Sequence, residues 1–203
     1  MSEKALFITG ASSGIGAATA RQTIANGWTV GLFARSEDKL NALVDELGDR
    51  AIALPGDVTD FESVKAAMDK FANHASGINA VYANAGAGLS AAGTDAGDPD
   101  EWERMIKVNV MGVLWTVKAA MPHLKESKGH MLLTGSAAGR RHIAGSVYGG
   151  RCTLIAPGMV DTPFFEEPKP DKLQPEDVAD AVLHALEANA RCAVNEIFLM
   201  PTQ

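Results

Sequence analysis

The segment that decides the fold is Thr9-Gly10-Ala11-Ser12-Ser13-Gly14-Ile15-Gly16, which follows the apolar run Lys4-Ala5-Leu6-Phe7-Ile8 and opens a helix-like stretch. Glycines accept backbone angles closed to other residues and let a ligand lie against the main chain. A helix that begins after such a turn presents unpaired N–H groups and the positive end of its dipole to an anion. The order strand, glycine turn and helix therefore predicts a nucleotide cofactor bound at Gly10, Ser12, Ser13, Gly14, Ile15 and Gly16.

The spacing of these glycines narrows the kind of ligand. The pattern is G-x-x-x-G-x-G, which differs from the G-x-G-x-x-G of the standard dinucleotide fingerprint. It also lacks the Lys-Ser/Thr ending of a nucleoside-triphosphate loop. A plain tight turn is the alternative interpretation of a glycine triplet. The apolar strand before it and Ala17-Ala18-Thr19-Ala20 after it favour cofactor binding.

Composition restricts the class of protein. The 203 residues fit one domain over residues 1–203, large enough for a substantial core. With 18 basic against 25 acidic residues the net charge is −7, which argues against nucleic acid and anionic membranes as partners. No apolar run reaches the length of a membrane span. Neither the histidines nor Cys152 and Cys192 have metal-ligand spacing, so we expect a cytoplasmic protein without a metal.

Apolar runs alternate with helical patterns along almost the whole chain. This alternation predicts a single-domain, doubly wound parallel α/β sheet of the Rossmann-like kind. The expected strands are Ala5–Thr9, Thr29–Ala34, Ala51–Leu54, Ala80–Ala83, His130–Thr134, Thr153–Ala156 and Glu196–Met200. The expected helices are Ile15–Asn26, Asp38–Leu47, Phe61–His74, Pro99–Lys125 and Pro175–Ala188.

The alternation fails between the strands that end near Thr134 and begin near Cys152. No helical pattern occurs there, and the stretch 135–151 contains five glycines. A parallel crossover takes a dozen or more residues and usually includes a helix. Seventeen glycine-rich residues would leave one face of the sheet bare. Either the protein is abbreviated here, or residues are missing from the sequence.

Arg35 follows the second strand, where dinucleotide folds recognise the adenosine ribose. An acidic residue at this point accepts hydrogen bonds from a 2′-hydroxyl, whereas an arginine suits a 2′-phosphate. Ala34-Arg35-Ser36 offers a cation and a hydroxyl without a carboxylate. The turn therefore favours NADP over NAD, and the alternative is a solvated surface arginine.

Two further turns follow predicted strands. Asp57 and Val58 come after the third strand and could meet the adenine edge. An aspartate that stabilises the turn before the next helix is an equally good interpretation. After the fourth strand, small residues would let a ligand approach the edge of the sheet, and a simple turn is again the alternative; they are Asn84, Ala85 and Gly86.

Three polar residues are candidates for chemistry. Asn109 lies in an apolar helical stretch, where a buried amide needs partners such as water, a backbone carbonyl or a helix distortion. Ser136 lies just beyond the carboxyl end of a strand, where open α/β sheets bind ligands. Tyr148 needs a nearby cation for acid–base work, because a tyrosine ordinarily has a pKa of about 10. Taken alone, Tyr148 is a packing residue. No Gly-x-Ser-x-Gly motif supports a hydrolase.

Together these residues resemble the classical branch of the short-chain dehydrogenase/reductase family, over nearly the full chain. The matching motifs are Thr9-Gly10-x-x-x-Gly14-x-Gly16, Asn84-Ala85-Gly86, Asn109 in Asn-Val-x-Gly, Ser136, Tyr148 and Pro157-Gly158-x-Val160-x-Thr162. Several ordered motifs at plausible spacings are far more specific than the glycine turn alone.

The resemblance implies an oxidoreductase that transfers hydride between NADP and a carbonyl or secondary alcohol. Tyr148 would be the acid or base, Ser136 would orient the substrate oxygen, and Asn109 would hold a water in the proton relay. The nicotinamide would be lined by Pro157, Gly158, Val160 and Thr162. The family commonly forms homodimers or homotetramers through the long helices beside the active site.

The chain departs from the family pattern Tyr-x-x-x-Lys, because the position of the lysine holds Cys152. That lysine binds the nicotinamide ribose and lowers the pKa of the tyrosine. The family also has a long helix after the tyrosine, which is absent here. Roughly two dozen residues missing between Tyr148 and Arg151 would explain both departures. If none are missing, the alternative function is a catalytically impaired dinucleotide-binding sensor or partner module.

Overall fold

Strand β1 (Ala5–Thr9) lies in the interior of a seven-stranded parallel sheet with the order β3-β2-β1-β4-β5-β6-β7. The computed structural model describes residues 4–88, 98–135, 151–165, 167–189, 191–192 and 194–202, with the backbone alone at residues 151 and 152. The other strands are β2 (Thr29–Ala34), β3 (Ala51–Pro55), β4 (Ala80–Ala83), β5 (His130–Thr134), β6 (Arg151–Pro157) and β7 (Glu196–Leu199). The predicted doubly wound Rossmann-like sheet is confirmed.

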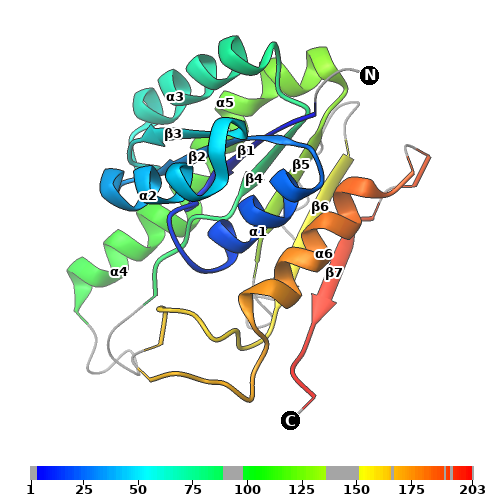
Figure 1. The fold of residues 1–203 in the computed structure, drawn as a ribbon. Helices are drawn as coiled ribbons and strands as arrows, with labels where there is room; N and C mark the ends of the chain where they lie inside the picture. Colours follow the sequence, from blue (N-terminus) through cyan, green and yellow to red (C-terminus); the bar gives the residue numbers. More distant parts are fainter. Residues whose placement is uncertain are drawn as a thin grey trace.

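Helices cover the two faces of this sheet (Figure 1). One face carries α1 (Gly14–Ala25), α2 (Glu37–Leu47) and α6 (Pro175–Glu187), and the other carries α3 (Phe61–Ala75) and α5 (Gly112–Ser127). A short 3-10 turn, η1 (Gly48–Arg50), leads from α2 into β3. None of the helices in the described ranges is long and apolar enough to cross a membrane.

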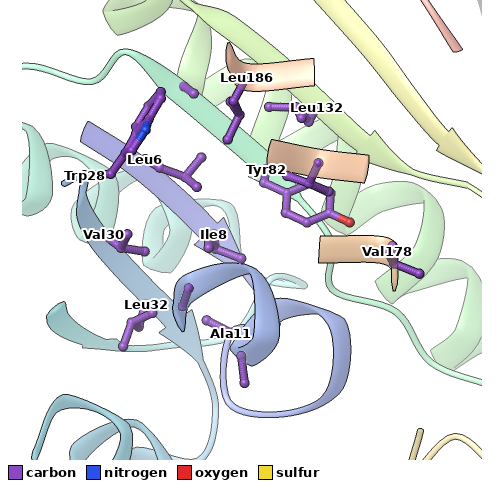
Figure 2. Close-up of a cluster of buried hydrophobic side chains, with 14 of the residues drawn as sticks. Leu6, Ile8, Ala11, Trp28, Val30, Leu32, Tyr82, Leu132, Val178 and Leu186 are labelled. Carbon is purple, nitrogen blue, oxygen red and sulfur yellow. The ribbon is translucent and has the colours of Figure 1, made fainter. Parts of the chain in front are cut away.

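Each face of the sheet has its own apolar cluster, because successive residues of a strand point to opposite sides. Figure 2 shows the cluster under α1 and α6, which contains Leu6, Ile8, Val30, Leu32, Tyr82, Val178 and Leu186. The opposite cluster contains three neighbouring aromatic rings. The ring centroid of Phe7 lies 5.7 Å from that of Phe33 and 6.0 Å from that of Phe71. Burial of strands on both faces explains their continuous apolar sequences.

The long helix expected over Pro99–Lys125 is not a uniform α-helix. It begins as α4 (Pro99–Ile106), widens into a π-helical turn, η2 (Lys107–Met111), and continues as α5 to Ser127. Such π-turns insert one extra residue into the helix and are frequent at functional sites. The apolar periodicity of the sequence predicted the helix but not this distortion.

Strands β6 and β7 carry apolar side chains on the same side of the sheet as α5. Leu154 on β6 is paired in register with Leu133, and Phe198 on β7 with Ala156, so these side chains share that face. Leu154 is half-buried, and Phe198 is 41% exposed. Within the described ranges no helix connects β5 to β6, and residues 136–150 lie outside them. The predicted bare face depends on residues 136–150, so it stays a prediction.

We expect Phe71→Ala to lower the free energy of unfolding by about 3–5 kcal/mol, because it leaves a cavity between Phe7 and Gly31 that the sheet cannot close. Urea unfolding followed by circular dichroism measures the loss. The matched control is Phe198→Ala on β7, where the side chain is 41% exposed, and it should cost less than half as much. An equal loss at the two positions would contradict the difference in burial between the two phenylalanines.

Candidate functional site

Predicted site residues that the structure describes follow the ends of several strands at one edge of the sheet, because parallel strands all end on the same side. The glycine turn follows β1, Arg35 follows β2, Asp57 comes two residues after β3, and Asn84 follows β4. The segment from Pro157 to Thr162 continues from the end of β6. This is the edge at which open α/β sheets bind their ligands.

The glycine turn passes so close to other main chain that it has no room for side chains. Gly10 has a φ of +67°, and a Cβ there would lie 2.8 Å from the Cα of Ala85. A Cβ on Gly16 would lie 2.3 Å from the carbonyl oxygen of Gly10. Side chains at either position would force the turn and the β4 loop apart. The glycine pattern is therefore a packing requirement of this edge.

The N-terminus of α1 is open to an anion. Ser13 is the N-cap residue, yet its side chain makes no capping hydrogen bond, and the first turn contains no acidic residue. The first N–H groups of a helix lack partners within the helix, so they are available to a ligand. Ile15 packs partly against the core and anchors this turn. Ser12 lies beside Lys39 in a separate cleft between α1 and α2. The donor set fits a pyrophosphate.

Asn84 ties the end of β4 to the glycine turn. Its side-chain amide donates to the carbonyl oxygens of Thr9, at 3.1 Å, and Gly10, at 3.4 Å. In return, the hydroxyl of Thr9 accepts hydrogen bonds from the backbone N–H groups of Asn84 and Ala85 at 3.0 and 3.1 Å. Asn84 thus links the ends of β1 and β4 by hydrogen bonds, which a simple turn, the alternative interpretation of its sequence, would not do.

A hydroxyl chain connects Asn84 to the core. Thr134, the last residue of β5, lies 3.1 Å from the Oδ1 atom of Asn84 and 2.8 Å from the phenol of Tyr82. Since the amide oxygen can only accept, Thr134 donates to Asn84, and the Tyr82 hydroxyl donates to Thr134. Burial raises the pKa of Tyr82 well above its ordinary value, so this phenol stays protonated. Sequence reasoning missed both Tyr82 and Thr134.

Asn109 lies in the π-helical turn and holds the β4 loop. Its Oδ1 atom accepts from the N–H of Ala87 at 2.7 Å, and its Nδ2 atom donates to the carbonyl oxygen of Ala87 at 2.8 Å. The residue is exposed, not buried as the apolar pattern suggested. Gly86 lies directly under this clamp, since a Cβ there would be 3.6 Å from the Asn109 oxygen. A backbone group, one of the expected partners, satisfies the amide.

The segment after β6 reaches the glycine turn. Gly158 donates its N–H to the carbonyl oxygen of Leu199 at 2.7 Å, which continues the pairing of β6 with β7 beyond Pro157. Val160 is 6% exposed and belongs to the core cluster under α1. Beyond it, the methyl group of Thr162 would lie 3.4 Å from a Cβ on Gly14. Thr162 and the start of α1 therefore border one space.

Arg35 and Asp57 line a cleft of about 340 Å³ at the ends of β2 and β3. Oδ1 of Asp57 accepts hydrogen bonds from the N–H and the hydroxyl of Thr59, each at 2.9 Å, so it stabilises its own turn as well. Val58 is buried against Gly112 and lies outside the cleft lining. The opposite wall comes from α4 and the π-turn, which sequence reasoning did not connect with this site; it comprises Asp100, Glu103, Arg104, Lys107 and Val108.

Two of the predicted catalytic residues, Ser136 and Tyr148, lie outside the described residues, as does the side chain of Cys152. Their roles remain predictions. Among the residues that the structure does describe, no group of three or more histidine, cysteine or acidic side chains is arranged to hold a metal ion.

Comparison with known proteins relates this arrangement to enzymes. The family model described as short chain dehydrogenase matches residues 4–150. An uncharacterized oxidoreductase of Staphylococcus epidermidis is 33% identical, covering 98% of this chain and 97% of its own. An alcohol dehydrogenase of Thermococcus sibiricus, complexed with 5-hydroxy-NADP, has a TM-score of 0.87 at 30% identity, covering 98% of this chain and 97% of its own.

A 3-ketoacyl-(acyl-carrier-protein) reductase of Brucella melitensis, complexed with NADH, also has a TM-score of 0.87, covering 98% of this chain and 97% of its own. At 22% identity it supports the fold alone.

The alignment with the staphylococcal relative is longer than this chain. It runs over 227 positions, 24 more than the 203 residues present here. At least that many positions of the alignment therefore have no counterpart in this chain. The match to the family model ends at residue 150, and β6 begins at Arg151.

We expect Thr134→Val, which keeps the side-chain shape but removes the hydroxyl, to lower the free energy of unfolding by about 1–3 kcal/mol. The buried phenol of Tyr82 would lose its partner. Chemical unfolding of Thr134→Val, Tyr82→Phe and the double variant measures the coupling. The double variant should lose less than the sum of the single losses, and strict additivity would contradict the hydroxyl chain. Thr116→Val, whose hydroxyl bonds only to the backbone of its own helix, is the control.

Proposed function

The chain belongs to the short-chain dehydrogenase family of NAD(P)-dependent oxidoreductases, and we propose that it uses NADP to interconvert a carbonyl and a secondary alcohol. Enzymes of this family act on small molecules, and the reacting group of the substrate would meet the cofactor at the carboxyl edge of the sheet. The observation that carries the proposal is the glycine turn, where main chain packs against main chain at Gly10 and Gly16 and leads into a helix without a side-chain N-cap.

The residues present fit the two ends of a dinucleotide. The N-terminus of α1 would hold the pyrophosphate through its free N–H groups. Arg35 would meet a 2′-phosphate, and Asp57 lines the same cleft, where the adenine would lie. The other half of the cofactor would extend toward Thr162, which borders the start of α1. A bound nicotinamide supplies or accepts the hydride, and the protein supplies orientation and electrostatics.

Tyr148 is the proposed acid or base. The chain has two tyrosines, and Tyr82 is excluded because burial raises its pKa and its hydroxyl is committed to Thr134. In this proposal Tyr148 exchanges the proton with the substrate oxygen and Ser136 orients that oxygen. Each end of the Asn109 amide holds the backbone of Ala87, and the amide keeps a second lone pair and a second N–H with which it would hold the water of a proton relay.

A second candidate function follows from Cys152, which stands where the family pattern has its lysine. Without a cation beside Tyr148, the pKa of a tyrosine stays too high for acid–base work at neutral pH. The alignment positions without a counterpart support the loss of a crossover between Tyr148 and Arg151. A chain with this loss would be a dinucleotide-binding sensor or partner module.

We expect the protein to oxidise NADPH in the presence of a panel of carbonyl compounds. Tyr148→Phe should lower kcat by about a hundred- to ten-thousand-fold, because it removes the proton donor, and should leave NADPH binding unchanged. Absorbance of NADPH measures turnover, and fluorescence titration measures binding. Turnover that survives in Tyr148→Phe would contradict the assigned acid.

The same assay decides between the two candidates. NADPH binding without turnover in the wild type would favour the sensor. In that case, inserting a helical segment between Tyr148 and Arg151 that restores the family pattern Tyr-x-x-x-Lys should create turnover. The same insertion with methionine in place of that lysine is the matched control.

The enzyme is proposed to be a cytoplasmic homodimer or homotetramer. Three exposed apolar side chains recur every four residues along α4, the π-turn and α5, with Ile106, Val110 and Leu114 each 43–52% exposed. Residues four apart lie on one side of a helix, so they form an apolar stripe that a second copy would cover.

We expect Leu114→Lys to lower the molecular mass in solution, as measured by light scattering, because it places a charge in the centre of that contact. Glu126→Lys, on the exposed end of α5, is the control for added positive charge and should leave the mass unchanged. A monomeric wild type would contradict the proposed assembly.

A further inference from the structure

The cleft at Arg35 has a second wall that no sequence motif indicated. The ends of β2 and β3 contribute Arg35, Asp57 and Thr59, and α4 with the π-turn contributes the facing residues. Figure 1 shows α4 beside the end of the sheet at which these strands finish. The space of about 340 Å³ is large enough for part of a nucleotide.

The charged residues of this cleft are not equivalent. Lys107 is paired with Glu103 at 2.5 Å, and one carboxylate oxygen of Asp57, Oδ1, accepts two hydrogen bonds from Thr59. In the described part of the chain, the guanidinium groups of Arg35 and Arg104 make no hydrogen bond or ion pair, although both lie in the lining. The walls thus present two arginines whose donors are unused.

The charges of the residues that line the cleft cancel, so its overall electrostatic potential does not favour an anion. Its three cations, Arg35, Arg104 and Lys107, are balanced by the three carboxylates of Asp57, Asp100 and Glu103. Selection must therefore come from direct contact with the unused guanidinium donors. A guanidinium presents a planar fork of N–H groups that matches the oxygens of a phosphate. A phosphate monoester carries a charge of about −1.5 to −2 at neutral pH, which two such groups can share.

We propose that Arg104 on α4 is a specificity-determining residue that, together with Arg35, binds the 2′-phosphate of the cofactor. The inference deepens the proposed function and rests on it. Arg35 approaches the phosphate from the end of the sheet, and Arg104 approaches it from the helix across the cleft. Asp100 lies one turn before Arg104 and has a carboxylate in the same lining, so it opposes phosphate binding.

Calorimetric titration with two nucleotide fragments tests this role without a reaction. Adenosine 2′,5′-bisphosphate carries the phosphate in question, and adenosine 5′-monophosphate lacks it. Arg104→Gln should weaken binding of the bisphosphate by about ten- to a hundred-fold, which is the size expected for charge-assisted hydrogen bonds. It should weaken binding of the monophosphate by less than about three-fold. Arg104→Lys should retain part of the preference, and Asp100→Asn should increase it.

The matched control is Lys107→Gln, which changes the net charge of the same cleft by the same amount but removes a cation already paired with Glu103. It should leave the ratio of the two affinities unchanged. Thermal unfolding of each variant confirms that these exposed helix residues are not needed for folding.

Three results would overturn the inference. Equal weakening of both fragments by Arg104→Gln would mean that the arginine contacts the base or the 5′-phosphate. If Lys107→Gln changed the ratio of the two affinities as much as Arg104→Gln does, the overall electrostatic potential of the cleft would select the phosphate, and direct contact with Arg104 would not. A wild type that binds NADP but is unaffected by Arg104→Gln would overturn this inference alone, whereas a wild type that binds neither NADP nor NAD would overturn the proposed function with it.

Discussion

Direct contact between main-chain segments, where no side chain fits, is the constraint on which the rest of the site depends. At the crossing of the glycine turn and the β4 loop, Gly10 meets Ala85, and Gly16 meets the carbonyl oxygen of Gly10. Hydrogen bonds between Thr9 and Asn84 hold the two segments at this distance. Because the crossing positions α1, it also determines where the free N–H groups of the helix point.

Hydrogen bonds from polar side chains connect this crossing to the core and to the π-turn. Thr134 links Asn84 to the buried phenol of Tyr82, and this chain joins the ends of β4 and β5 to the core. Asn109 reaches the same loop from the π-turn and holds Ala87 by both ends of its amide. A low-dielectric interior strengthens such satisfied networks, and these bonds fix the positions of the loops at this edge of the sheet.

Much of the fold and part of the site could be predicted, for local reasons. Strands buried on both faces need continuous apolar runs, so β1 and β2 are visible in the sequence. The glycine turn is visible because only glycine fits where main chains touch. Arg104 was not predictable, since a helix surface arginine has no local signal of the cleft that it lines. The same holds for Thr134 and Tyr82, whose hydroxyls meet only when two strands pair.

The sequence by itself determined the order of the elements, the family and the position of the glycine turn, because these depend on residue type and periodicity along the chain. It also exposed the break in the pattern, with Cys152 in place of a lysine. Only the tertiary structure decided which side chains share a space. The clamp of Asn109 on Ala87, the approach of Thr162 to Gly14 and the place of Arg35 and Arg104 in the lining of one cleft all bring together segments far apart in sequence. Such neighbours depend on strand order and helix packing, which no local pattern encodes.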